Sequence, residues 1–176
     1  MPNIFSVRQN DPPDEQIKIS DAGTDALIAA LVLAGSALAV SDTQKRLIVW
    51  LAEHDKRLGA GFLGFAIGDM PWEQDTFPQD RAFMVRVVDA ASEQRGWETM
   101  TFPPDLTQLR PILGWFRKRF VRLKWEDVSP TARVDWLDDM DDDDPTRCGF
   151  PRCERHGALL TYLGCQVCHT QRGGLL

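Results

Sequence analysis

The stretch that decides the fold is Asp21-Ala-Gly-Thr-Asp-Ala-Leu-Ile-Ala-Ala-Leu-Val-Leu-Ala-Gly-Ser-Ala-Leu-Ala-Val40. Alanine and leucine dominate it, and both are strong helix formers. Its alanines and glycines are short side chains at which other helices can approach closely. We therefore expect a helix that begins at residue 21 or 24, ends at residue 40 and lies at the centre of a helical bundle.

The most apolar part of this stretch is expected to be too short to span a membrane. Its most apolar part, residues 26–40, reaches roughly 22 Å at about 1.5 Å per residue, whereas the hydrocarbon layer is ~30 Å thick. The preceding segment is acidic, where a signal peptide would be basic. We therefore expect a cytoplasmic protein with no membrane partner, in which the thiols are reduced.

Composition narrows the classes of protein to consider. A chain of 176 residues with 43% hydrophobic residues is long enough for one domain with a substantial core. The net charge of -6 argues against a protein that coats nucleic acid or an anionic membrane through bulk charge. The sequence has no nucleophile elbow, phosphate-binding glycine loop or carboxylate pair at diagnostic spacing, so an enzyme is disfavoured.

The rest of the chain is expected to be mainly α with short β segments, as a bundle of about five helices followed by a zinc-bound hairpin. Cap residues and apolar spacing predict four more helices. The first, at 41–58, begins with the capping box Ser41-Asp-Thr-Gln44 and ends before Gly59, and the second, at 78–95, ends before Gly96. The third, at 105–123, is capped by Asp105, and a short fourth helix begins at Ser129-Pro130. Pro111 predicts either a later start or a bend in the third of these. Short strands are expected at 4–7, within a loosely ordered lead-in, and at 97–102.

Every cysteine of the chain lies in one short segment near its end: Cys148, Cys153, Cys165 and Cys168. Two close pairs of thiols on tight turns can converge on one tetrahedral ion, because thiolate sulfur binds zinc at about 2.3 Å. Three neighbouring arginines, at positions 147, 152 and 155, could offset the negative charge of the thiolates. The segment therefore predicts a zinc site.

This spacing resembles that of four-cysteine zinc-ribbon and zinc-knuckle modules, over residues 148–168 only. The resemblance implies a structural Zn²⁺ held by four thiolates. The first pair is wider than in those modules and few residues follow Cys168, so we expect residues 158–163 to pack on the helical body. Three parts are thus expected: a helical domain at 1–140, an acidic linker at 141–147 and the zinc module at 148–176.

Alternative ligands and roles remain open for this segment. His156 or His169 could replace one cysteine as a ligand. A catalytic zinc would need an open position for water, which four thiols do not leave. A redox pair formed by Cys165 and Cys168 is a weaker alternative, because such a pair normally opens a helix in a βαβ unit.

Five basic residues gather toward the end of the helix expected at 105–123: Arg117, Lys118, Arg119, Arg122 and Lys124. Basic side chains release counterions on contact with phosphates, and the aromatic residues among them could stack on bases. The alternative, which we favour, is that the aromatic side chains belong to the core. The charges would then form a solvated face, which the acids at 138–144 could neutralise.

A second candidate surface combines acids with a tryptophan at one turn: Asp69, Trp72, Glu73 and Asp75. An exposed tryptophan surrounded by acids could bind a basic protein partner, although acids in loops are common without any function.

Three hypotheses for function follow. The first is a zinc-stabilised cytoplasmic interaction protein, similar in composition to an immunity protein or an inhibitor of a basic toxin. The second is a nucleic-acid-associated zinc-ribbon factor that uses the basic helix 110–124. The third is an enzyme whose zinc is purely structural, because catalytic residues need not be close in sequence.

Overall fold

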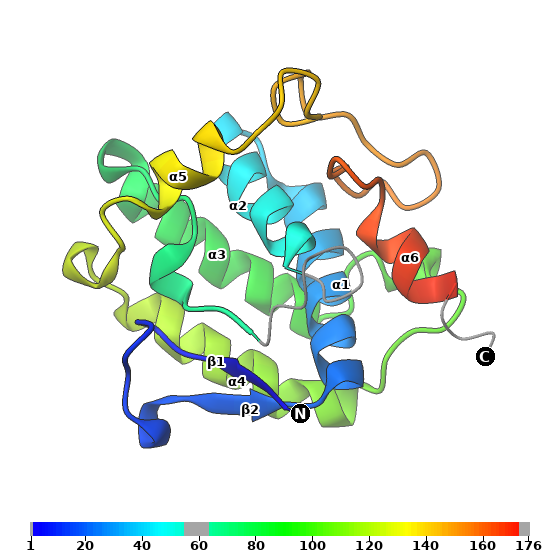
Figure 1. The fold of residues 1–176 in the computed structure, drawn as a ribbon. Coiled ribbons are helices and arrows are strands. Elements are labelled where there is room, and N and C mark those ends of the chain that lie inside the picture. The colour runs from blue at the N-terminus through cyan, green and yellow to red at the C-terminus, as the bar shows by residue number, and fades with distance from the viewer. Residues whose placement is uncertain (1, 55–63, 173–176) are drawn as a thin grey trace.

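Helix α1 (Asp21–Leu38) lies among the other helices of the protein. In the computed structural model, which describes residues 2–54 and 64–172, α1 packs against α2 (Asp42–Glu53), α3 (Phe77–Ser92), α4 (Leu106–Arg122) and α6 (Gln166–Arg172) (Figure 1). All residues from Leu27 to Ser36 are buried. This burial on every side explains why apolar residues surround the whole helix instead of forming one stripe. The expected central helix is confirmed.

By length and composition alone, α1 is also the one helix among the described residues that could cross a membrane. Its mean hydropathy is 1.4 over 18 residues, and 67% of this window is buried inside the protein. Packing against four other helices is sufficient to account for its apolar composition.

The contact between α1 and α2 depends on a glycine. A Cβ atom added at Gly35 would lie 2.2 Å from Cδ1 and 2.7 Å from Cγ1 of Ile48, whose side chain is itself fully buried. The two backbones therefore approach at a position where no side chain fits between them.

The serine cap expected at the start of α2 is present, but the return bond of the expected capping box goes to Val40, one residue before the cap. Ser41 Oγ accepts a hydrogen bond from the amide of Gln44 at 3.3 Å, and Gln44 Oε1 accepts one from the amide of Val40 at 3.0 Å. The helix is described as far as Glu53, and the expected stop at Gly59 lies outside the described residues.

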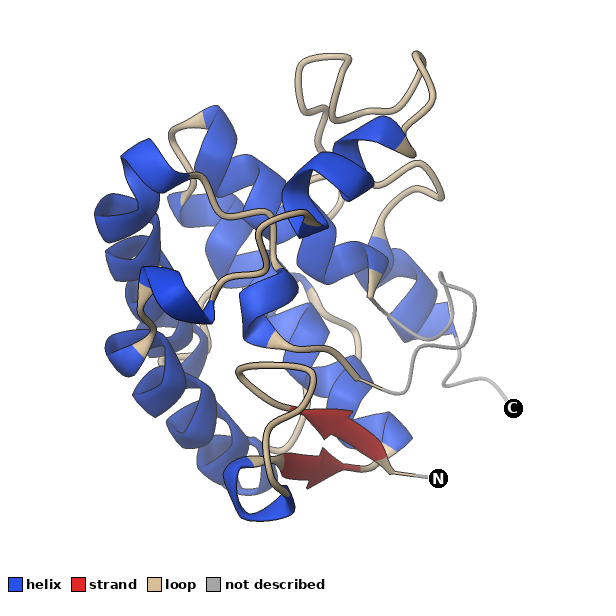
Figure 2. Cartoon of the chain, turned by 60° about the vertical axis from the view of Figure 1, so that its left-hand side comes forward, coloured by secondary structure: helices blue, strands red, loops and turns tan. Residues whose placement is uncertain are grey.

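The first residues are ordered and contribute to the core, which corrects the loosely ordered lead-in. Strands β1 (Asn3–Phe5) and β2 (Ile17–Ile19) pair antiparallel at one edge of the bundle (Figure 2). Phe5 is fully buried and its ring packs edge-on against Phe65 and Phe116. Asn3 Nδ2 donates to Thr24 Oγ1 at 2.8 Å, which ties this hairpin to the start of α1.

The strand expected at 97–102 is wrong, because this segment begins with a turn of 3₁₀ helix (Trp97–Thr99). Gly96 adopts a left-handed conformation with φ 85°, and its carbonyl accepts hydrogen bonds from both the amide and the hydroxyl of Thr99. Apolar alternation over so few residues does not distinguish a short strand from a turn with one buried ring.

The remaining helices follow the sequence with shifted ends. Asp105 Oδ1 accepts from the amide of Thr107 at 2.8 Å, so α4 begins at its expected cap and Pro111 lies inside the helix. Helix α5 (Ala132–Asp138) begins after the expected Ser129-Pro130 start, with Thr131 at its N-cap, and the amide of Ser129 donates to the carbonyl of Gly68 at 2.9 Å. The expectation of a mainly α protein with short β segments is confirmed.

Two glycine substitutions test the packing of α1 on α2. Gly35→Ala should lower the free energy of unfolding by about 1–2 kcal/mol, since the overlap with Ile48 outweighs the gain in helix propensity. Gly114→Ala in α4 is the matched control: its added Cβ meets nothing within 4 Å, and it should stabilise by about 0.5–1 kcal/mol. Denaturant unfolding measures both, and equal stabilisation by the two variants would contradict the close helix contact.

Candidate metal centre

The first half of the candidate metal centre is a tight turn that carries Cys153 and His156. The amide of Gly157 donates to the carbonyl of Cys153 at 2.8 Å, and Gly157 adopts a left-handed conformation with φ 66°. Residues three apart on such a turn direct their side chains to the same side. The turn therefore presents one sulfur and one imidazole toward a single point.

The second half is the start of α6, which the sequence did not predict. A turn at 161–164 reverses the chain, with the amides of Thr161 and Gly164 each donating to the other residue's carbonyl. Cys165 then precedes the helix and Cys168 lies in its first turn, so that their sulfurs share one face.

Four ligand atoms converge where these halves meet. They are the Sγ atoms of Cys153, Cys165 and Cys168 and one ring nitrogen of His156, and all lie within 4.8 Å of one another. His156 Nδ1 is 3.7, 3.7 and 3.3 Å from the three sulfurs, and the sulfurs of Cys153 and Cys168 are 3.8 Å apart. A tetrahedral zinc site requires edges of about 3.6 Å between nitrogen and sulfur and about 3.8 Å between sulfurs. These four distances are close to the required edges, so the cluster could hold a metal ion.

The ligand set expected from the spacing needs correction at one position. Cys148 is exposed and lies outside the group of converging atoms, and His156 takes the fourth position. Two residues further on, Phe150 is buried and adopts a left-handed φ of 56°. Cys148 is instead part of the preceding turn, where its amide donates to the carbonyl of Asp144. His169, the other expected substitute, contacts the carbonyl of Leu163 through Nε2 at 3.0 Å.

A signal for His156 was present in the sequence. Cys153 and His156 are separated by two residues, and so are Cys165 and Cys168. This repeated short spacing is commoner in zinc sites than the wider spacing from Cys148 to Cys153, so giving it more weight would have selected the observed set.

In the absence of a metal ion, burial favours the neutral form of three of the four ligand groups. Burial raises the pKa of the Cys165 thiol to about 12, and burial also raises the pKa of Cys168. At Cys153 the effect of burial is outweighed by hydrogen bonds from the backbone of His156 and Arg155, and its pKa is lowered. Burial lowers the pKa of His156, so its ring is neutral and has a lone pair for a ligand. A metal ion that binds here would therefore have to displace the protons of Cys165 and Cys168.

Models of protein families, curated proteins and solved structures offer no match to this chain. The assignment of the centre therefore depends on its own geometry.

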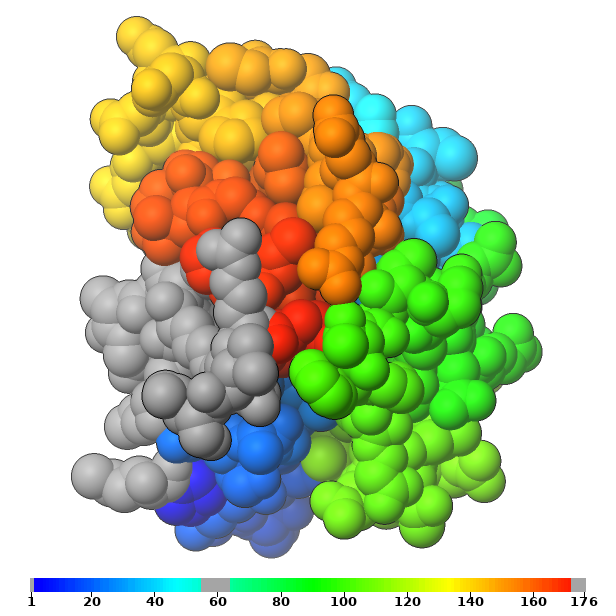
Figure 3. Space-filling view, turned by 90° about the vertical axis from the view of Figure 1, so that its right-hand side faces the viewer, coloured from blue at the N-terminus to red at the C-terminus, as the bar shows by residue number. Residues whose placement is uncertain are grey.

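The metal centre is docked on the helical body by a small set of specific contacts. The amide of Leu159 donates to Ser36 Oγ in α1 at 2.9 Å, and Arg152 donates to the carbonyl of Ser36. Gln171 in α6 exchanges two hydrogen bonds with the backbone of Phe102. Figure 3 shows this segment, in orange and red, against the green segment that contains Phe102. Ala158 and Leu159 are fully buried, so this part of the module belongs to the main core, as expected.

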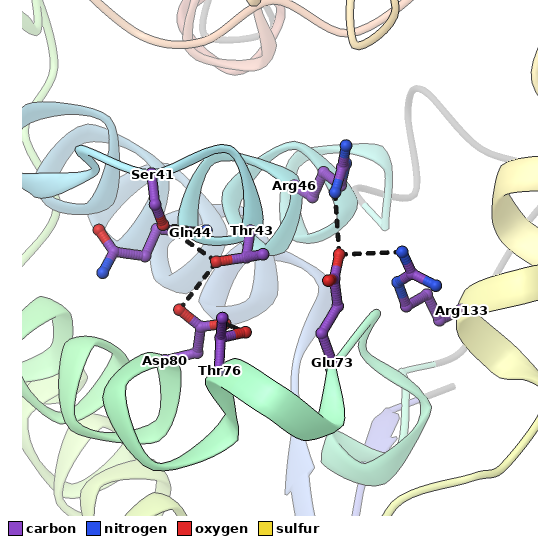
Figure 4. Close-up of polar contacts among 8 residues, drawn as sticks. All are labelled: Ser41, Thr43, Gln44, Arg46, Glu73, Thr76, Asp80 and Arg133. Carbon is purple, nitrogen blue, oxygen red and sulfur yellow. Dashed lines mark hydrogen bonds and ion pairs between the residues drawn. The ribbon is translucent and has the colours of Figure 1, made fainter.

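The acidic and aromatic surface expected around Trp72 is largely engaged within the protein. Trp72 is only 2% exposed, and its Nε1 donates to the carbonyl of Ile67 at 2.9 Å. Glu73 Oε1 accepts from both Arg46 and Arg133 at 2.9 Å (Figure 4). Asp69 accepts from the side-chain amide of Gln9, and Asp75 is exposed. The tryptophan is therefore not available to a partner at this surface.

Figure 4 also shows hydrogen bonds between α2 and the start of α3. Buried Asp80 accepts hydrogen bonds from Thr43 Oγ1 at 3.0 Å and Thr76 Oγ1 at 2.7 Å, which joins α2 to α3. The acids and hydroxyls here connect elements to one another.

The basic residues of α4 have acidic neighbours from distant parts of the chain. Arg117 forms a two-point ion pair with Asp89, at 2.7 and 3.3 Å. Arg119 stacks over Trp115 and donates to the carbonyl of Glu15. Arg122 lines a small cavity that also includes three acids: Asp11, Glu15 and Asp127. Lys118 and Lys124 are exposed.

One further feature was missed by sequence reasoning. This feature is a cavity of about 720 Å³, here named the acidic cavity. Its walls carry two tryptophans, a tyrosine, a histidine and five acids: Trp50, Trp136, Tyr162, His54, Glu53, Asp139, Asp141, Asp143 and Asp144. Met140 and Pro145 complete the lining. The run of acids was expected to be solvated, and five of its six members are exposed: Asp138, Asp139, Asp141, Asp142 and Asp143. Asp144, in contrast, is only 6% exposed.

Two cysteine variants test the ligand set. Cys165→Ser should lower the bound metal well below one equivalent per chain, because it removes one of the four converging atoms. Cys148→Ser should leave the metal content unchanged, since this thiol lies outside the cluster. Elemental analysis measures the metal, and circular dichroism should show that both variants keep their helices. Equal loss of metal in both variants would indicate that Cys148 is a ligand and that all four cysteines bind the ion.

The docking of the module is tested at Ser36. Ser36→Ala leaves the buried amide of Leu159 without its acceptor and should lower the free energy of unfolding by about 1–3 kcal/mol. Ser92→Ala is the control, because that hydroxyl bonds only to the carbonyl of Val88 in its own helix, and it should change stability by less than about 0.5 kcal/mol. A negligible effect of Ser36→Ala would argue against this contact as an anchor.

Proposed function

We propose that a zinc ion occupies the cluster of Cys153, His156, Cys165 and Cys168 in a structural role, and that the protein is a zinc-stabilised interaction protein. The observation that carries the proposal is the convergence of four protein ligand atoms at tetrahedral spacing. Three sulfurs and one imidazole are the soft donors that select zinc over magnesium or calcium.

The closed ligand set supports a structural role. A catalytic zinc keeps one coordination position for water or substrate, whereas here protein side chains supply all four. Bound zinc would neutralise two of the three thiolate charges and hold the turn at 153–157 against the first turn of α6. Residues between these ligands, including the buried Ala158 and Leu159, would thereby be fixed on α1.

The centre resembles a zinc ribbon only in part. Short antiparallel bridges join Arg152 to Leu159 and Thr161 to Gly164. The second pair of ligands, however, opens a helix, where a ribbon would place a second hairpin. A redox role for Cys165 and Cys168 is disfavoured because a third thiol and an imidazole share their position.

An interaction role with a basic protein partner is favoured by the distribution of charge. The net charge is -6, and the acids at 139–144 are concentrated around one cavity. The nucleic-acid hypothesis has less support, because Arg117, Arg119 and Arg122 lie beside acids or backbone carbonyls of the protein itself. A role like that of an immunity protein or inhibitor in a reducing compartment fits this proposal.

An enzyme with a structural zinc is the second candidate, and the acidic cavity is the observation that favours it. Burial raises the pKa of Glu53 to about 7, a value suited to proton transfer. No serine, threonine, cysteine or lysine is present among the described residues that line the cavity. His54 Nδ1 lies 2.7 Å from the carbonyl of Trp50, and burial lowers the pKa of this ring to about 4. These features suit binding better than covalent catalysis.

Cobalt substitution tests the structural role. Protein reconstituted with Co²⁺ in place of zinc should show the intense visible absorption of a tetrahedral thiolate site, and added azide or cyanide should not change it, because no position is open. Chelation should increase proteolysis at residues 158–163 while most of the helical circular dichroism remains. A spectrum that shifts with azide would indicate an open, catalytic type of site and contradict the proposal.

A further inference from the structure

We propose that the acidic cavity is the binding site for an arginine side chain of a basic partner protein. This inference deepens the proposed interaction function, on which it rests. The cavity lies between the end of α2, which supplies Trp50 and Glu53, and α5, which supplies Trp136. Its other walls are formed by the segment after α5 and by Tyr162, which lies between His156 and Cys165 of the candidate metal centre.

The negative charge of this cavity is not balanced within the described part of the chain. Five carboxyl groups line it, and no lysine or arginine among the lining residues accompanies them. The nearest ion pair in this acidic segment joins Arg147 to Asp142, which is not a lining residue. Acids gathered around a concave surface with low-dielectric walls concentrate the field, and they attract a cation more strongly than the same acids on an open face.

Two of these carboxyl groups are largely buried, and each uses one oxygen inside the protein. Glu53 Oε2 accepts from Trp136 Nε1 at 2.7 Å, and Asp144 Oδ1 accepts from the amide of Thr146 at 2.8 Å. Their other oxygens accept no hydrogen bond from residues 2–54 or 64–172. A desolvated carboxylate without a counter-ion is unfavourable, so a cationic donor that reaches both groups would relieve the cost of burying them.

The arrangement fits an organic cation better than a metal ion. Calcium and magnesium bind oxygens at about 2.0–2.6 Å, so their ligand atoms must lie within roughly 5 Å of one another. Among the described residues, only one group of three or more His, Cys, Asp or Glu side chains has its ligand atoms within 4.8 Å of one another. That group is the cluster of Cys153, His156, Cys165 and Cys168, and no carboxylate belongs to it. The acids of the cavity are instead spread along walls that also carry three aromatic rings.

Aromatic walls and separated carboxylates select arginine in particular. A guanidinium is planar, stacks on indole and phenol rings, and donates five N–H groups in directions that can reach several carboxylates. The cavity volume of about 720 Å³ exceeds the volume of one side chain, so it admits an arginine together with neighbouring residues of its peptide. A lysine ammonium would gain the charge attraction but less of the stacking.

Binding should be linked to protons and to the metal. Burial raises the pKa of Glu53 to about 7, so a guanidinium that favours the charged form should bind more tightly as pH rises from 6 to 8. The titratable groups that face Glu53 in the cavity are the aspartates at 139, 141, 143 and 144, together with Tyr162 and His54; burial keeps His54 neutral over this range. Tyr162 lies in the chain between His156 and Cys165, so loss of zinc should displace one wall and weaken binding.

The experiment is a calorimetric titration of the zinc-loaded, full-length protein with three capped tripeptides, Gly-Arg-Gly, Gly-Lys-Gly and Gly-citrulline-Gly. Arginine should bind most tightly, lysine more weakly, and citrulline, its uncharged isostere, at least about tenfold more weakly than arginine. Affinity for arginine should fall with added salt. Equal affinity for arginine and citrulline, or displacement of the peptide by Ca²⁺ at one equivalent, would overturn the proposal.

Matched variants locate the site. Glu53→Gln keeps an acceptor for Trp136 and removes the charge, and it should weaken arginine binding about tenfold or more and remove its dependence on pH between 6 and 8. Asp142→Asn removes an acid of the same run that does not line the cavity, and should leave binding unchanged. If Glu53→Gln is poorly folded by circular dichroism, Asp141→Asn at the exposed rim provides the same test. Equal weakening by Asp142→Asn would mean a diffuse charge effect and would refute the site.

Zinc analysis on the same samples separates this inference from the proposed function. Protein without zinc would refute the structural-zinc proposal whatever the peptide does. Zinc-loaded protein that does not distinguish arginine from citrulline would refute the cavity inference alone.

Discussion

The burial of α1 on all sides is the constraint on which the rest of this structure depends. A helix of this composition has no face that can be left in water, so neighbours must cover it all round. Helices α2, α3 and α4 pack against α1, and so does α6, which carries Cys168 of the candidate metal centre. The segment that carries the cluster is joined to α1 at Ser36. The hydroxyl of Ser36 accepts a hydrogen bond from the amide of Leu159, and its carbonyl accepts one from the guanidinium of Arg152. The metal module is therefore part of the body's core and not an appendage.

A metal ion bound at the cluster would also fix the position of residues that are not its ligands. The segment between His156 and Cys165 contains Leu159, which is fully buried, and Tyr162, which is 59% exposed and lines the acidic cavity. One end of the segment thus contributes to the core, while the other forms a wall of the acidic cavity. An ion at the cluster would fix both at once, since neither short turn contains enough apolar surface to hold its own conformation.

Sequence patterns predicted the features that depend on local chemistry and missed those that depend on distant contacts. The central helix, the cap at Ser41 and the cap at Asp105 are local, and each is present. The burial of Trp72 and the buried β1 strand depend on partners far along the chain, which spacing does not reveal. Three of the four expected ligands, Cys153, Cys165 and Cys168, lie on local turns and belong to the converging group, whereas Cys148 lies outside it and His156 lies within it.

The charges of the protein show the same division between local pattern and tertiary contact. The basic run on α4 is a solvated face whose acidic neighbours come from elsewhere in the chain: Asp89 pairs with Arg117, and Asp11, Glu15 and Asp127 surround Arg122. The acids at 138–144, which sequence alone offered as the balance for that run, instead lie mainly around the cavity with Glu53. Among the described residues, opposite charges are thus paired around α4, whereas the lining of the acidic cavity contains five acids and no lysine or arginine. Under the proposal made above, this concentration of negative charge would favour a cationic partner.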